Sequence, residues 1–489
     1  MADNLKNKSM KGMAWTGVAR LLKQVIQFAI GILLARQLMP EDYGIIGMLA
    51  IFIAIGETFL DSGFASALIQ KKDRTEVDYS TVFFFNVVVS LVLYAIIFIS
   101  APWIAEFYSL PILTDVTRVV SLALIINGLT IIQTAKLSIE LNFHLQAIAD
   151  ISSVIIGGLL ALYLAYHGWG VWSLVFQGIS SAGIRALILW LFSHWCPTWA
   201  FSYESFRRMF SFGSKLLCSG MINTIYDNLY TLVIGKAFTA SQVGFFNRGD
   251  HFAQLPTKTV QDMVVKVNYP ILSSMQDDEE KLEATYKKLL AAPMFLLYPL
   301  LMGLIVLGAP LVEVLIGAKW LPCVPIMQII CIGCMFDPLT HINLNLLYVK
   351  GRTDLVLKLE FIKKPIGFLL LFISIPFGIL WMCAGRSLYS LIAYIFNCYY
   401  TDKMIHYGFF SQMKVLLPII FRSILMGIVV FFVIQCFDNL WAKLFIGSIT
   451  GVVSYILSCI LSKDNTFFEV RTMVMQSKYV QRFLNNRLS

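Results

Sequence analysis

Basic and amide side chains recur at helical spacing within some of the most apolar stretches of this sequence. Arg20, Lys23 and Gln27 are three and four residues apart, so they lie on one face of a helix. Arginine and lysine bind phosphate groups through charge-assisted hydrogen bonds. We therefore expect a water-filled, cationic cleft that binds an anionic substrate. Its predicted substrate-binding residues are Arg20, Lys23, Gln27, Lys215, Asn223 and Arg248.

Acidic side chains also occur inside apolar stretches, and Glu57 and Asp61 share a helical face at a spacing of four residues. A charge at the bilayer centre costs about 2.5 to 3.5 kcal/mol on insertion scales, so it usually faces a cavity or a partner. The candidate residues for a coupling proton or sodium ion are Glu57, Asp61, Asp227 and Asp337. The alternative for such acids is a structural ion pair. For Arg20, the alternative is a side chain that reaches the headgroups.

Membrane-spanning helices must position these residues. Of the 489 residues, 58% are hydrophobic and only 14% are charged, whereas soluble proteins are nearer 25% charged. A helix needs about 20 apolar residues to cross the hydrocarbon. We predict an all-α polytopic membrane protein with fourteen spans. They are expected at 12–36, 45–69, 80–103, 116–138, 148–167, 170–193, 212–237, 244–271, 286–308, 322–349, 355–376, 379–400, 415–436 and 441–461.

Loop charges predict the orientation of the chain. Positive residues gather in every second loop, including 71–74, 207–208 and 350–352, so these loops and both termini are expected in the cytoplasm. The net charge of +9 is spread over such loops, which argues against nucleic-acid binding. The loops are too short for a soluble catalytic domain.

No cofactor and no metal are expected. The sequence contains no GxxxxGK[ST] phosphate-binding motif, so this chain is not expected to hydrolyse ATP. Its nine cysteines follow no metal-binding or disulfide pattern. A coupling proton or sodium ion is the only small ion that we expect.

An internal repeat predicts the domain organisation. Residues 33–46 match 233–246 in register, with Arg36 on Lys236 and Gly44 on Gly244. Both copies start in the same orientation, so they are parallel repeats related by an axis along the membrane normal. We predict two six-helix lobes around a central cleft, 1–200 and 201–405. Residues 406–489 are expected to add two spans and an amphipathic, basic cytoplasmic tail.

Four segments resemble the Wzx-type polysaccharide flippases of the multidrug/oligosaccharidyl-lipid/polysaccharide exporter superfamily, in particular the lipopolysaccharide and capsule branch. They are 12–48, 61–73, 244–290 and 347–364. The resemblance covers most of the chain and fades after about residue 400.

The resemblance implies a flippase that moves oligosaccharide units linked to undecaprenyl pyrophosphate across the bacterial inner membrane. It implies alternating access without ATP. By position, it also implies that the pyrophosphate is held by Arg20, Lys23, Lys215 and Arg248. Membrane lipids are expected partners, and polysaccharide polymerases and assembly proteins are further candidates.

Two other functions stay open. An antiporter for drugs or small cations, from the same superfamily, would prefer an anionic cleft, and the basic residues argue against it. A membrane polysaccharide polymerase or sugar transferase usually needs a large external loop. The longest external loop predicted here, around 104–115, is too short for that.

Overall fold

The computed structural model describes residues 2–61, 63–71, 73–193, 195–276, 278–464, 466–468 and 472. Side chains are described from residue 17 onward, except those of Ser66, Phe212 and Lys215. All the regular elements within these ranges are helices, so the predicted all-α class is confirmed. The chain divides into two compact units, Met1–Asn247 and Arg248–Ser489. The lobe boundaries expected from the repeat, at residues 200 and 405, stay a prediction.

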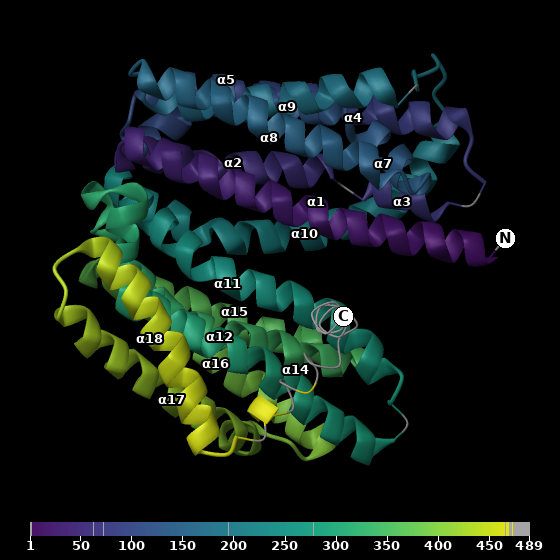
Figure 1. The fold of residues 1–489 in the computed structure, drawn as a ribbon. Helices are drawn as coiled ribbons and strands as arrows, with labels where there is room; N and C mark the ends of the chain where they lie inside the picture. The colour runs from purple at the N-terminus through teal and green to yellow at the C-terminus, as the bar shows by residue number, and fades with distance from the viewer. Residues whose placement is uncertain are drawn as a thin grey trace, which may run out of the picture. The chain divides into compact units, whose positions relative to one another are not determined.

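The first unit contains ten helices within the described residues, together with the start of an eleventh (Figure 1). Helix α8 packs against both α1 and α9, and α10 packs against α2. The helices are α1 (Ala2–Gln37), α2 (Pro40–Leu60), α3 (Phe64–Gln70), α4 (Glu76–Tyr108), α5 (Ile112–Val120), α6 (Leu122–Gly128), α7 (Ile131–Ile139), α8 (Phe143–Tyr166), α9 (Val171–Phe192), α10 (Tyr203–Ala237) and α11 (Ala240–Ser273).

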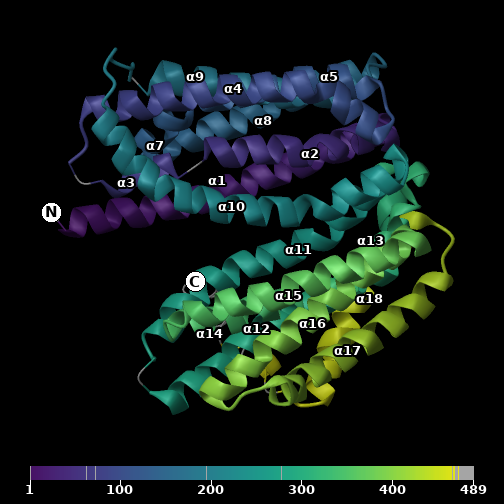
Figure 2. The same ribbon diagram turned by 180° about the vertical axis from the view of Figure 1, so that it is seen from behind.

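The second unit begins inside α11 and continues to the C-terminal helices (Figure 2). Helix α16 packs against α13, α14 and α15, whereas α12 packs against α17 and α18. The elements are α12 (Glu279–Ile316), the 3-10 helix η1 (Ala318–Trp320), α13 (Cys323–Cys334), α14 (Asp337–Val349), α15 (Thr353–Ser374), the 3-10 helix η2 (Ile375–Phe377), α16 (Ile379–Ile405), α17 (Phe409–Gln435) and α18 (Leu440–Leu461).

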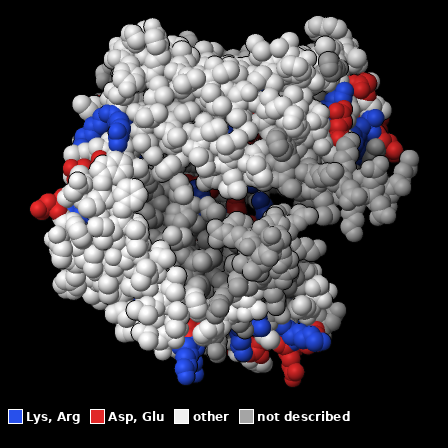
Figure 3. All heavy atoms as spheres, viewed as in Figure 1, with Lys and Arg blue, Asp and Glu red and all other residues white. Residues whose placement is uncertain are grey.

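The helices account for the predicted spans. In the described part of the chain, 11 helical segments are long and apolar enough to cross a membrane. Helices α10, α11 and α15 are of comparable length but more polar, and with them the total agrees with the fourteen predicted spans. On the face of the first unit seen in Figure 3, charged side chains gather at the two ends and are scarce between them. An apolar middle suits contact with lipid tails.

Three predicted spans are not single helices. The span expected at 45–69 is divided into α2 and α3, because Gly63 has φ of 75°, a backbone conformation that glycine adopts without steric cost. The span at 322–349 is divided into α13 and α14, where Pro338 lies in the first turn of α14 and lacks an N–H donor. The span at 116–138 is formed by α5, α6 and α7 in series.

The two copies of the repeat touch each other within the first unit. A Cβ atom on Gly44 would overlap the backbone carbonyl of Ala240, and one on Gly244 would overlap that of Pro40. Both glycines lie in the first turns of their helices, α2 and α11. The two backbones approach this closely because both positions lack a side chain.

Candidate functional site

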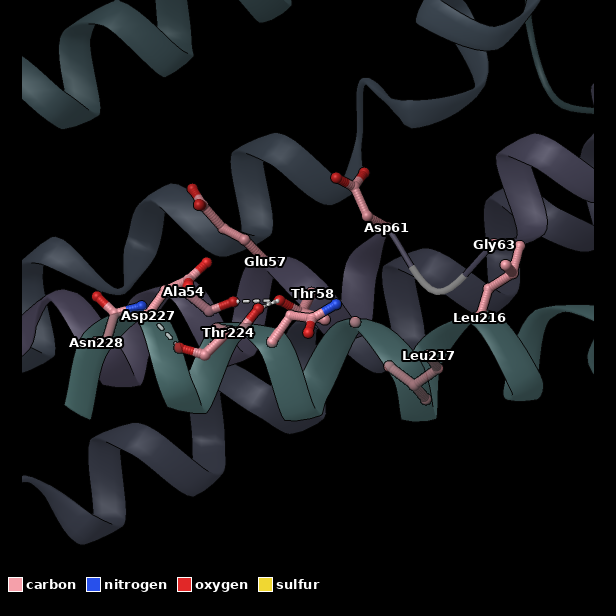
Figure 4. Close-up of a pocket in the computed structure, with 12 residues that line it drawn as sticks. Ala54, Glu57, Thr58, Asp61, Gly63, Leu216, Leu217, Thr224, Asp227 and Asn228 are labelled. Atoms are coloured by element: carbon pink, nitrogen blue, oxygen red, sulfur yellow. Dashed lines mark hydrogen bonds between the residues drawn. The ribbon is translucent and has the colours of Figure 1, made fainter. Parts of the chain in front are cut away.

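A polar cavity of about 590 Å³ lies in the first unit between α2 and α10 (Figure 4). Its charged lining consists of Glu57 from α2, Asp61 directly after the end of α2 and Asp227 from α10, all with exposed side chains. Thr58, Asn223, Thr224 and Asn228 supply hydroxyl and amide groups. Four of the residues predicted from sequence as substrate or ion ligands are therefore brought to one cavity: Glu57, Asp61, Asn223 and Asp227.

Hydrogen bonds fix the floor of this cavity. The Thr58 hydroxyl donates to the Ala54 carbonyl at 2.8 Å, so in the 2.8 Å contact between Thr58 and Thr224 the Thr224 hydroxyl donates. Asn228 Nδ2 donates to the carbonyl of Thr224 at 2.9 Å. Figure 4 shows that Glu57 and Asp61 point to the same side of α2, away from these bonds. The two carboxylates are thus available to a ligand.

The described lining of the cavity contains no Lys or Arg side chain. Within the described residues, no three His, Cys, Asp or Glu side chains are close enough together to hold a metal ion. The described lining therefore offers hydrogen-bond acceptors and negative charge. The cationic cleft expected from sequence stays a prediction. The side chain of Lys215, which was predicted to supply a positive charge here, lies outside the described residues.

A second polar cluster in the first unit joins α1, α8 and α9. Asp150 accepts hydrogen bonds from Lys23 Nζ at 3.0 Å and from Arg185 Nε at 2.8 Å. Arg185 also lies 3.5 Å from the Thr130 hydroxyl and 3.3 Å from that of Thr134. Sequence reasoning missed Asp150 and Arg185, although a lone charge within an apolar span is itself a signal of a functional or paired residue.

The other predicted residues belong partly to the first unit and partly to the second. Arg20 and Gln27 have exposed side chains on α1. Arg248 belongs to the second unit, and its guanidinium lies 5.6 Å from the centre of the Trp320 ring. Asp337 also belongs to the second unit, where Arg386 and Ser390 are its polar neighbours. Arg386 forms an ion pair of 2.8 Å with Asp250.

The second unit also contains a closed polar network between α14, α16 and α17. Asn343 Oδ1 accepts from Thr401 at 2.6 Å and from Gln412 Nε2 at 3.0 Å. Gln412 Oε1 accepts from the Tyr394 hydroxyl at 3.0 Å. All four side chains are fully buried. Because these groups satisfy one another, the network fixes the packing of the three helices.

The fold and these clusters define a polytopic helical membrane protein with polar groups between its helices. The structure is similar to that of the lipid II flippase MurJ in an inward closed conformation, with a TM-score of 0.74 and 17% sequence identity over 92% of this chain and 99% of that chain. It is also similar to an inward-facing multidrug resistance MATE family transporter of the MOP superfamily, with a TM-score of 0.61 and 16% identity over 80% of this chain and 96% of that one.

The sequence profile described as "polysaccharide biosynthesis protein" matches residues 33–325, and the chain belongs to this family. It is 24% identical to the lipopolysaccharide biosynthesis protein WzxC of Escherichia coli K12, over 94% of this chain and 89% of that protein. It is 23% identical to the succinoglycan biosynthesis transport protein ExoT of Rhizobium meliloti 1021, over 96% of both. The resemblance to the polysaccharide flippase superfamily is therefore confirmed.

Proposed function

We propose that this protein is a flippase that moves lipid-linked oligosaccharide units across the bacterial inner membrane for the assembly of a surface polysaccharide. One observation carries the proposal. Nearly the whole chain corresponds both to relatives named for polysaccharide biosynthesis and transport and to the fold of a lipid II flippase. The multi-pass helical architecture, without a large loop domain in the described residues, supports a transporter rather than an enzyme.

The proposed substrate is an oligosaccharide on undecaprenyl pyrophosphate, and the proposed mechanism is alternating access without ATP. A pyrophosphate carries about two or more negative charges, and moving it through hydrocarbon without partners would be prohibitive. Cations in a hydrated cleft lower this cost by Coulomb attraction and hydrogen bonds. Arg20, Lys23, Lys215 and Arg248 remain the proposed pyrophosphate ligands, with Gln27 and Asn223 beside them.

The acidic residues are proposed to carry the coupling ion, a proton or Na⁺. The position of Glu57, Asp61 and Asp227 around one cavity supports this assignment in the first unit. Asp337, with Arg386 nearby, is the corresponding proposal in the second unit. Both termini are proposed to be cytoplasmic. Membrane lipids, and polymerase or assembly proteins that receive the flipped units, are the proposed partners.

A second candidate function is a small-molecule antiporter similar to the MATE transporter. The carboxylates of the cavity favour it, because a cationic drug would bind them. Proteoliposomes that contain the protein should then exchange ethidium for protons or Na⁺. We expect no such exchange.

The flippase proposal is tested by deletion of the gene from its native strain. We expect lipid-linked oligosaccharide to accumulate on the cytoplasmic leaflet, where an external glycosidase cannot reach it in spheroplasts. In sealed liposomes without protein an added glycosidase reaches only the lipid in the outer leaflet, whereas purified protein reconstituted with this extracted lipid should make nearly all of it accessible. Loss of the surface polysaccharide with no accumulation of the lipid-linked precursor would contradict a flippase and favour an earlier biosynthetic step.

A further inference from the structure

Asp150 is the common partner of two cations that come from two other helices. Its Oδ2 atom accepts from Lys23 of α1, and its Oδ1 atom accepts from Arg185 of α9. One carboxylate is therefore hydrogen-bonded to two cations. Each of the three side chains keeps about a third of its surface exposed, at 33%, 31% and 29% for Lys23, Asp150 and Arg185. A ligand can reach this cluster without unfolding a helix.

The guanidinium of Arg185 is oriented by more than one group. Its Nε is bound to Asp150, while Nη1 and Nη2 face the hydroxyls of Thr130 and Thr134. Asp61 lies close enough to Arg185 to interact with it electrostatically. An arginine presents five N–H donors in a planar fork, which matches a phosphate group. The chain thus holds a preoriented phosphate-binding side chain that sequence reasoning did not identify.

We infer that Asp150 competes with the substrate's pyrophosphate for Lys23 and Arg185, and that this competition sets the rate of substrate release. The inference rests on the proposed function. When the pyrophosphate arrives, its oxygens take over the hydrogen bonds of both cations. When it leaves, Asp150 pairs with them again. An unpaired charge in a protein interior is costly, so a resident carboxylate lowers the free energy of the empty site. Asp150 is a positioning residue, and Arg185 is a substrate-binding residue beside Lys23.

The physical consequence is a moderate affinity. Without Asp150 the two cations would bind a pyrophosphate more tightly, because no ion pair would have to break first. A flippase must release its cargo on the far side of the membrane, so tighter binding slows the cycle. Replacement of Asp150 should therefore change affinity and rate in opposite directions. Replacement of a residue with a merely structural role would lower both the affinity and the flipping rate.

The experiment measures the binding of undecaprenyl pyrophosphate to the purified full chain in micelles by calorimetry, and flipping of lipid-linked oligosaccharide in proteoliposomes. For Asp150→Asn we expect a Kd about tenfold lower, equal to 1.4 kcal/mol, together with slower flipping. Arg185→Gln should raise Kd about tenfold. The matched control is Asp354→Asn, which also removes a carboxylate that accepts two bonds from cationic side chains, here both from Arg352 at the exposed start of α15. Its Kd and rate should equal those of the unchanged protein.

The inference is overturned if Asp150→Asn binds undecaprenyl pyrophosphate equally well or more weakly. If that variant does not fold, the charge-balanced pair Lys23→Gln and Asp150→Asn provides the test. Compared with Lys23→Gln alone, the double variant frees Arg185 and should recover several-fold in affinity, and no recovery contradicts competition. These outcomes are separate from the proposed function, which fails only if the unchanged protein flips no lipid-linked oligosaccharide.

Discussion

The cavity between α2 and α10 and the network around Asn343 contain similar polar side chains in opposite surroundings. In the cavity, the carboxylates of Glu57 and Asp61 are exposed, and their neighbours leave space for a ligand. In the network, Asn343 and Gln412 are fully buried and bonded to each other. Polar groups that satisfy one another hold helices together, whereas polar groups beside open space can exchange partners. We expect transport to depend on the first region and stability on the second.

The largest expected effect is on the free energy of unfolding, when the closed network around Asn343 is disrupted. Asn343→Leu removes the partner of Thr401 and Gln412, and buried polar groups left without a partner cost about 1 to 3 kcal/mol each. We expect the free energy of unfolding to fall by about 3 kcal/mol in denaturant titrations in micelles. The control is Asn228→Leu in the cavity, where the single bond to Thr224 is lost and water can replace it. An equal loss of unfolding free energy in both variants would contradict the proposed difference between the closed network and the open cavity.

The next effect concerns energy coupling through the open cavity. Moving one charge across 100 mV supplies about 2.3 kcal/mol, which is an accumulation ratio of about 50-fold. Glu57→Gln and Asp61→Asn should remove the part of transport that depends on the potential or the ion gradient. The unfolding temperature should change little, since both side chains are exposed. Proteoliposomes with an imposed gradient provide the measurement. If flipping still responds fully to the gradient in both variants, these acids have only a structural role.

A smaller effect is expected at the contact between the repeats. The Cβ of Gly44→Ala would overlap the carbonyl of Ala240, so α2 and α11 must separate locally. Overpacking of this kind costs about 1 to 3 kcal/mol. Thermal unfolding of the purified variant measures the loss. Gly183→Ala in α9 is the control, because that position has open space around it, and alanine there should be neutral or stabilising.

The smallest effect compares two threonines that each bond to a side chain of another helix, Thr58 as the acceptor and Thr401 as the donor. Thr58→Val removes the acceptor of the Thr224 hydroxyl and the bond that Thr58 donates to the Ala54 carbonyl. Because water can reach the cavity floor, the loss should cost below about 0.5 kcal/mol. Thr401→Val removes a bond to Asn343 in the closed network and should cost about 2 kcal/mol. Equilibrium unfolding of the two variants gives this difference directly. Equal costs would show that the cavity is as closed as the network.

The sequence predicts the helices better than it predicts the partners of their charges. Helical spacing placed Glu57 and Asp61 on one face, and α2 presents both to the cavity. The spacing within one helix does not reveal contacts between helices, so the ion pairs of Asp150 with Lys23 and Arg185 were not foreseen. Asp150 and Arg185 are each the only Asp, Glu, Lys or Arg residue of their helices. Their meeting depends on how α1, α8 and α9 pack.

The same limit applies to the expected cationic cleft, which stays a prediction. Counting basic residues on single helices favoured Arg20, Lys23 and Gln27 as a lining. In the structure Lys23 is paired with Asp150, and the described lining of the cavity is acidic. A polar stripe identifies a helix face that avoids lipid, but the sign of the resulting site is set by residues on neighbouring helices.

The close approach of Gly44 to Ala240 and of Gly244 to Pro40 has the form of an isologous dimer contact. At the repeat's offset of 200 residues, position 40 of one copy meets position 44 of the other, and the reverse pair is present as well. A contact of this kind is closed on itself, as it is between two identical subunits. Because both copies are in one chain, corresponding positions do not have to carry the same residue. Position 40 is proline, for example, and its counterpart at position 240 is alanine. The two contacting segments can therefore diverge in sequence, which two identical subunits cannot do.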